Sequence, residues 1–262
     1  MTRQAYYKHQ HATQRRLLHE EIIVAAVLEI RERQPMLGGR KLHHLLSKKF
    51  ADSELAMGRD QLYNLLRERK LLVPQRRNYR RTTQSYHRFR VYTNLIRDLV
   101  IHRILQVVVA DITYIHTLEG FCYLALLTDA CSRKIVGYDL SRSLSIEGSL
   151  RALQMMLQQA KPAASVGLIH HSDRGIQYCS DAYVELLHQH GAQISMTEEQ
   201  HVYENAKAER VNGILKTEFM LGQKLSSFAV AKELVDESIY IYNHERPHLS
   251  LNYQTPAIRH AA

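Results

Sequence analysis

The stretch Ile169-His170-His171-Ser172-Asp173-Arg174-Gly175 is the part of the chain from which the fold can be worked out. An apolar run from Val166 to Ile169 leads into it, and a glycine closes it. This pattern predicts a short buried strand that ends where the carboxylate of Asp173 emerges. Neighbouring strand residues point to opposite faces, so we expect one histidine to face the carboxylate and the other to be structural.

Two further acidic residues can be matched to Asp173. Asp111 interrupts the apolar, β-branched run from Val107 to Ile115, and Glu209 lies 35 intervening residues beyond Asp173. The segment 203–222 predicts a helix with a core stripe made of Ala208, Val211, Leu215 and Phe219. A polar stripe beside it contains Asn205, Glu209, Asn212 and Lys216. A lone helical glutamate is usually a solvated charge, but Glu209 has no basic residue four positions away on either side.

We expect these three carboxylates to converge and to hold a divalent metal. Mg²⁺ takes oxygen ligands and keeps several waters, so a few carboxylates suffice when a substrate phosphate completes the site, and Mn²⁺ can substitute. Two such ions about 3.5–4 Å apart suit displacement at phosphorus. Without metal the carboxylates repel, which should raise the pKa of at least one of them. Asp129 is the competing carboxylate, but it precedes a turn and is interpreted as structural.

The middle of the chain predicts a mixed α/β sheet. Strands are expected over 105–115, 121–129, 134–140, 166–169 and 192–196, and helices over 146–160 and 181–190. Three meandering strands followed by alternating helix and strand give a five-stranded sheet with helices on its faces. Three cysteines without metal-ligand spacing favour a reducing cytoplasm, and no apolar run is long enough to span a membrane.

Positive charge is concentrated in the N-terminal third. Residues 1–94 hold 20 Lys and Arg against 8 Asp and Glu, whereas residues 95–262 hold 15 against 18. An excess of this size favours nucleic acid as the partner. Helices are predicted over 14–33, 40–50 and 59–68, which matches a helix-turn-helix module as well as a plain three-helix bundle; the charge favours the first.

The segment 74–94 contains arginines with interleaved aromatics and no acidic residue, which suits contact with phosphates and bases. A solvated hinge explains its missing apolar periodicity equally well. We therefore expect four segments: a helix-turn-helix DNA-binding region over 1–73, a basic linker over 74–98, a catalytic core over 99–222, and a C-terminal helix and tail over 223–262.

Several motifs in order resemble a known family. They are DITYI at 111–115, DACSRKIVG at 129–137, HSDRG at 171–175, NAKAE at 205–209, LKTE at 215–218 and YNHERPHLSL at 242–251. Together they resemble bacterial insertion-sequence transposases with a retroviral-integrase-like DDE core, in particular the downstream-frame (OrfB) product of the two-frame, copy-out/paste-in group. The resemblance covers nearly the whole chain.

The resemblance implies a ribonuclease-H-like core in which Asp111, Asp173 and Glu209 are the metal-binding catalytic triad, with Mg²⁺ as the cofactor, bound as two ions. The implied reaction nicks element ends and joins the 3′-hydroxyl to a second DNA phosphodiester. Implied partners are the terminal inverted repeats, target DNA, further copies of the chain and the upstream-frame product, usually as a frameshift fusion, in the bacterial nucleoid. Candidate DNA contacts are Arg59, Arg76, Arg77, Arg80, Arg81, Arg88, Arg174, Asn205, Asn212, Lys216 and Arg246.

Two alternatives stay open on the sequence alone. One is a ribonuclease-H-like nuclease that cuts without joining. The other is a catalytically silent DNA-binding repressor derived from a transposase.

Overall fold

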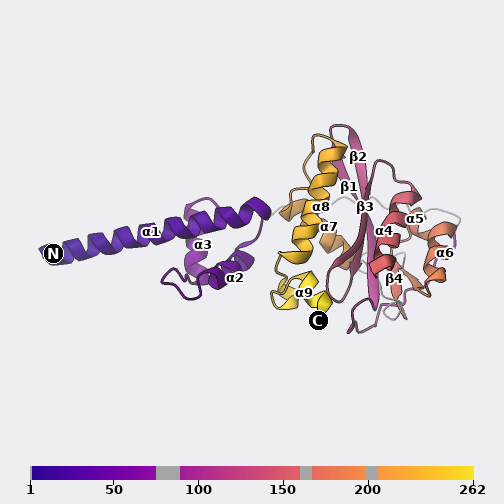
Figure 1. Ribbon diagram of the computed structural model, residues 1–262, viewed down its shortest axis with the longest axis horizontal. Helices are drawn as coiled ribbons and strands as arrows, with labels where there is room; N and C mark the ends of the chain where they lie inside the picture. The colour runs from indigo at the N-terminus through magenta and orange to yellow at the C-terminus, as the bar shows by residue number, and fades with distance from the viewer. Residues whose placement is uncertain (1, 75–88, 160–166, 199–205) are drawn as a thin grey trace. The chain divides into compact units, whose positions relative to one another are not determined.

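The computed structural model describes residues 2–74, 89–159, 167–198 and 206–262 (Figure 1). They form two compact units. The first is built from residues 2–74 together with 248–253, and the second from the rest of the described chain. None of the described helices is both long enough and apolar enough to cross a membrane.

The first unit holds three helices, α1 (Arg3–Arg33), α2 (Gly39–Lys49) and α3 (Arg59–Glu68). Their shared core is aliphatic and includes Ile23 and Val27 of α1, Leu42 of α2 and Leu62 of α3. The bounds of α3 are those predicted, and α2 differs by one residue at each end. The helix-turn-helix interpretation is thus compatible with the structure, and its contact with DNA stays a prediction.

Helix α1 begins at Arg3, earlier than the predicted start near residue 14. The hydroxyl of Thr2 accepts a hydrogen bond from the amide of Ala5 at 3.3 Å, which caps the first turn. The early turns have no apolar stripe because α2 and α3 cover only the C-terminal half of α1 (Figure 1). Apolar periodicity therefore could not reveal them.

The second unit is built on one five-stranded sheet with the order β3-β2-β1-β4-β5. Its strands are β1 (Val107–Thr117), β2 (Gly120–Asp129), β3 (Ile135–Ser141), β4 (Ile169–Ser172) and β5 (Gln193–Met196). The first three form an antiparallel meander, whereas β4 runs parallel to β1 and β5 parallel to β4. Gly120 closes the first hairpin at a φ of 118°, which side-chain-bearing residues rarely adopt. The predicted fold class is confirmed.

Helices cover both faces of the sheet (Figure 1). One face carries α4 (Ile146–Gln159), α5 (Ile176–Cys179) and α6 (Asp181–Gln189), and the other carries α7 (Ala206–Glu218) and α8 (Phe228–His244). The alternation of β1 sets this division: Val108 and Ala110 pack with α4, whereas Val107 and Val109 pack with Ala208 of α7. A 3-10 turn (Leu249–Leu251) and α9 (Pro256–Ala261) end the chain.

The predicted position of β4 is wrong by three residues. The strand was expected over 166–169, and it covers Ile169–Ser172. Both histidines are fully buried inside it, because each has a polar partner: His170 Nε2 lies 2.9 Å from the Tyr183 hydroxyl, and His171 Nδ1 lies 2.8 Å from the Ser195 hydroxyl. Polar side chains with a hydrogen-bond partner on a neighbouring element can continue a buried strand. A sequence rule that ends a strand at its first polar residue therefore places the end of β4 too early.

Candidate active site and nucleic-acid interface

Two of the predicted carboxylates come together because of the register between β1 and β4. Val107 pairs with Ile169 and Val109 with His171 in the parallel ladder. Asp111 follows Val109 by two residues, and Asp173 follows His171 by two. Parallel strands lie about 4.8 Å apart, so the same register brings both carboxylates to one end and one face of the sheet. This face is the one that α7 covers.

The pKa of Asp111 reflects its burial and the nearby Asp173 carboxylate. Burial raises the pKa of its carboxyl, and the Asp173 carboxylate raises it further, so that it reaches about 7. The Asn212 amide and the backbone N–H of Ile112 act in the opposite direction, and Glu209 adds a smaller upward contribution. A raised pKa is what the sequence led us to expect of clustered carboxylates without a cation.

Asn212 connects α7 to this carboxylate. Its Nδ2 donates a hydrogen bond to Asp111 Oδ2 at 2.6 Å, and its side chain is 6% exposed. Its Oδ1 is buried and has no hydrogen-bond partner among the described residues. An amide held in this way fixes the orientation of the Asp111 carboxylate and presents an unused acceptor to the same site.

Glu209 lies in the first turn of α7, three residues before Asn212, and its side chain is exposed. Residues three apart are neighbours on a helix surface, so Glu209 lies next to the Asn212–Asp111 contact. Among the described residues, however, no three His, Cys, Asp or Glu side chains are close enough to hold a metal ion together. The structure thus pairs Asp111 with Asp173 and brings Glu209 within electrostatic range, but not into direct contact.

The loop that carries Asp173 is fixed by its own hydrogen bonds. The amide of Gly175 donates to Asp173 Oδ1 at 3.0 Å, and Arg174 Nε donates to the carbonyl of Thr197 at 2.8 Å. Gln177 Nε2 donates to the carbonyl of Leu144 at 2.8 Å. Asp173 is therefore held on a rigid turn, and Arg174 has a structural contact with the end of β5.

Lys216 adds positive charge on the same side of α7. Desolvation lowers the pKa of its half-buried ammonium, and the negative charge of Asp111 partly opposes this shift. A lysine this close to the carboxylates can meet a phosphate that approaches them.

Asp129 has a structural role, as interpreted from the sequence. It is fully buried and accepts hydrogen bonds from the amide of Leu105 at 3.0 Å and the amide of Ser132 at 2.8 Å. Burial alone would raise the pKa of this carboxyl, but its hydrogen bonds, from His260 and Ser132 first, hold the pKa below its ordinary value. Its lone pairs are occupied, so it does not compete for the site.

The predicted DNA contacts have different locations. Arg59 is exposed at the start of α3, where its Nε lies 2.8 Å from Asp60 Oδ1. Arg246 is 3% exposed and forms two hydrogen bonds with Glu218, so its placement does not support a contact with DNA. Asn212 is also committed to the protein interior through Asp111. Six predicted contacts lie outside the described residues: Arg76, Arg77, Arg80, Arg81, Arg88 and Asn205.

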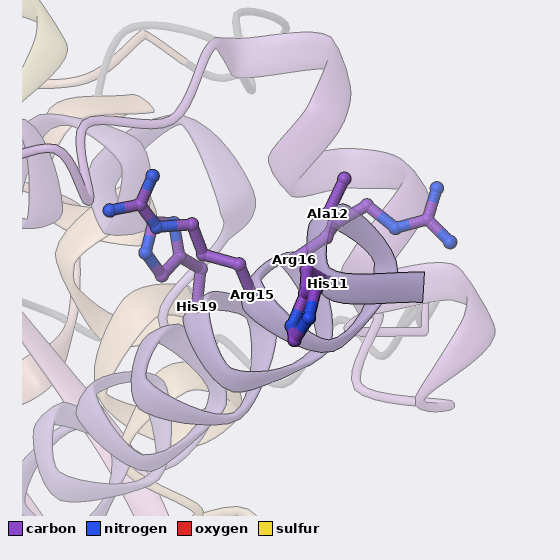
Figure 2. A pocket seen from close by; sticks show the side chains of 5 residues that line it. All are labelled: His11, Ala12, Arg15, Arg16 and His19. Carbon is purple, nitrogen blue, oxygen red and sulfur yellow. The ribbon is translucent and has the colours of Figure 1, made fainter. Parts of the chain in front are cut away.

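A basic surface on α1 was missed. Figure 2 shows a shallow hollow lined by His11, Ala12, Arg15, Arg16 and His19, all from this helix. His11, Arg15 and His19 recur every four residues, so they align along one face. No acidic residue occurs between Arg3 and His19, and that spacing was the signal available in the sequence.

Comparison with known proteins agrees with this geometry. Residues 102–201 and 190–256 each match a family model described as an integrase core domain. A Shigella sonnei protein, the insertion element IS600 uncharacterized 31 kDa protein, is 37% identical over 214 residues, which cover 81% of this chain and 78% of the relative. The transposase for insertion sequence element IS629, also from Shigella sonnei, is 33% identical over 177 residues, which cover 68% of this chain and 59% of the relative.

Among solved structures, the intasome of simian T-cell lymphotropic virus in complex with PP2A regulatory subunit B56 gamma matches with a TM-score of 0.50 at 14% identity. The match covers 84% of this chain and 74% of the viral one, and it bears on the fold alone. The fold and the paired carboxylates define an integrase core. The chain belongs to the integrase-core family, and within it to the insertion-sequence transposases, as its motifs predicted.

Proposed function

We propose that this transposase nicks the ends of an insertion element and joins the freed 3′-hydroxyl to another DNA phosphodiester at a site formed by Asp111, Asp173 and Glu209. The observation that supports it most is that the strand register brings Asp111 and Asp173 together, where burial first and the Asp173 carboxylate second raise the pKa of Asp111 to about 7. Two carboxylates held together against their mutual repulsion favour a cation between them. The family match supports DNA phosphodiesters as the substrate class.

The side chains present fit a divalent metal. Asp111 and Asp173 offer hard oxygen ligands, Glu209 supplies a third carboxylate from an exposed turn, and the Oδ1 of Asn212 can accept a hydrogen bond from bound water. We infer Mg²⁺ as the natural ion, with Mn²⁺ as a substitute and two ions in the full site. Bound there, the metal would activate the attacking oxygen and stabilise the leaving one.

The protein's own residues orient and neutralise the reacting groups. Asn212 donates to Oδ2 of Asp111, the amide of Ile112 donates to its Oδ1, and the amide of Gly175 donates to Oδ1 of Asp173, so both carboxylates are held in fixed orientations. Lys216 supplies positive charge for the phosphate. Glu209 would reach the other two acids through a different side-chain rotamer, because Asn212 on the same helix already touches Asp111.

DNA would be held outside the site by basic surfaces. We propose that the exposed Arg59 and the α1 surface of Figure 2 contact phosphates, together with the predicted linker arginines. Assembly into a dimer or larger complex on DNA, and fusion to the upstream-frame product, are proposed from the resemblance.

A strand-joining assay tests the function. A duplex with a pre-nicked 3′-hydroxyl end is incubated with target DNA and Mg²⁺ or Mn²⁺. A joined product supports the transposase. Cleavage without joining would instead indicate a nuclease, and binding without either product would indicate a repressor.

A further inference from the structure

An ion pair between the buried Arg246 and the partly buried Glu218 joins the end of α7 to the segment that follows α8. Arg246 Nε lies 2.9 Å from Glu218 Oε2, and Arg246 Nη2 lies 2.8 Å from Glu218 Oε1. The guanidinium also lies over the ring of Tyr242, 5.7 Å from its centroid. We propose that this pair, the α7–α8 clamp, positions α7 so that Glu209 faces the Asp111–Asp173 site. The proposal rests on the catalytic role proposed for Glu209.

The α8 side of the clamp is anchored to the sheet. Asn243 Oδ1 accepts from the amide of Ile135 at 2.9 Å, and its Nδ2 donates to the carbonyl of the same residue at 3.0 Å. The hydroxyl of Tyr242 donates to the carbonyl of Arg133 at 3.1 Å. The C-terminal turn of α8 is therefore tied to the start of β3, and Arg246 extends this rigid frame to α7.

The clamp and the Asn212–Asp111 hydrogen bond hold α7 on opposite sides of its core-facing stripe. With 3.6 residues per turn, Asn212 and Glu218 lie roughly 60° to either side of the core stripe formed by Ala208, Val211 and Leu215. The apolar stripe is non-directional and tolerates some rotation of the helix about its axis. The two polar contacts do not, because rotation in either sense lengthens the Asn212–Asp111 bond or the Glu218–Arg246 bonds.

The size of the effect follows from helix geometry. A carboxylate on a helix lies about 5–6 Å from the axis, so a rotation of about 20° moves it by about 2 Å. That movement equals a whole Mg²⁺–oxygen distance of about 2.0–2.1 Å. Losing a group that orients a metal ligand directly typically lowers metal affinity or activity by about 10- to 100-fold, and a ligand displaced by this distance should cost a similar factor.

A paired substitution separates positioning from mere stability. Removing one partner leaves a buried charge unpaired and destabilises the fold, whereas replacing both does so far less. We therefore compare Glu218→Gln/Arg246→Met with Asp139→Asn/Arg151→Met, which removes another two-bond Arg–carboxylate pair (2.9 Å each) between β3 and α4. Thermal unfolding, amide exchange in α7 and the Mn²⁺ dependence of joining are measured for the full chain.

The clamp predicts that Glu218→Gln/Arg246→Met unfolds near the wild-type temperature, while its α7 amides exchange faster and half-maximal joining needs about 10- to 100-fold more Mn²⁺. The Asp139/Arg151 control should keep wild-type exchange in α7 and a wild-type Mn²⁺ response. Should the double variant fail to fold, Arg246→Lys carries the test, because a lysine keeps the charge without the two-bond geometry and should shift both readouts in the same direction.

Wild-type α7 exchange and Mn²⁺ response in the clamp variant would overturn the proposal. So would a loss of DNA affinity in Arg246→Met with unchanged α7 exchange, since that result would make Arg246 a DNA contact. Glu209→Gln belongs in the same series. If it joins DNA at the wild-type rate, the proposed function fails, while amide exchange still decides whether the clamp holds α7.

Discussion

Replacing Asn212 by leucine gives a sharp test of how the carboxylate site is tuned. The substitution keeps the branching of the side chain at Cγ and removes the 2.6 Å hydrogen bond from Nδ2 to Asp111 Oδ2. That bond stabilises the charged form of Asp111 and opposes the upward pKa shift caused by burial and Asp173. Hydrogen bonds to charged groups contribute about 1.5–3 kcal/mol, which corresponds to about 1–2 pKa units.

The variant should therefore keep Asp111 protonated to a higher pH. We expect the rising limb of the pH–rate profile for strand joining to move up by about 1–2 units at limiting Mn²⁺, and half-maximal joining to need more Mn²⁺ at neutral pH. Thr217→Val on the same helix is the matched control, because Thr217 donates only to the carbonyl of Gly213. A pH profile and a Mn²⁺ response identical to wild type would refute the role assigned to Asn212.

Three further predictions concern the acids and the basic surface. Asp173→Asn should abolish joining and leave salt-sensitive DNA binding intact; an active variant would remove Asp173 from the mechanism. Folding raises the pKa of Asp111 from 3.8 to about 7, so ionisation of this carboxyl destabilises the metal-free protein as the pH rises between these two values, by at most about 4 kcal/mol. Asp111→Asn should therefore unfold at a higher temperature than wild type at pH 8 and lose this advantage at pH 4. A wild-type-like unfolding temperature at pH 8 would contradict the buried, repelled carboxylate. Arg15→Ala/Arg16→Ala should weaken DNA binding and reduce the slope of log affinity against log salt by about 2, and an unchanged slope would exclude the α1 surface as a phosphate contact.

The sequence predicted the parts of this molecule that depend on local patterns. The bounds of α3 followed from the spacing of Leu62, Leu65 and Leu66, and the meander followed from alternating apolar runs with a glycine turn. Acidic residues within or directly after apolar runs, Asp111 and Asp173, pointed to one site, and parallel pairing of β1 with β4 is the reason they meet.

The remaining features depend on contacts between distant segments. Asn212 meets Asp111 across 101 positions, and Arg246 meets Glu218 across 28, so no local pattern shows that these side chains serve the interior rather than DNA. The sequence pattern ends β4 before its histidines, because their partners, Tyr183 and Ser195, are supplied by other elements. A polar residue considered alone favours an exposed position, whereas a hydrogen-bond partner from another element allows it to be buried.

Iron-directed cleavage of the protein tests the central claim most directly. Fe²⁺ placed in the Mg²⁺ site generates hydroxyl radicals that cut the nearby backbone, and the cut positions can be mapped in the full chain bound to DNA. Convergence of the three acids predicts cuts near residues 111, 173 and 209 that excess Mg²⁺ suppresses together. Cuts near 111 and 173 with none near 209 would show that Glu209 does not share the metal site.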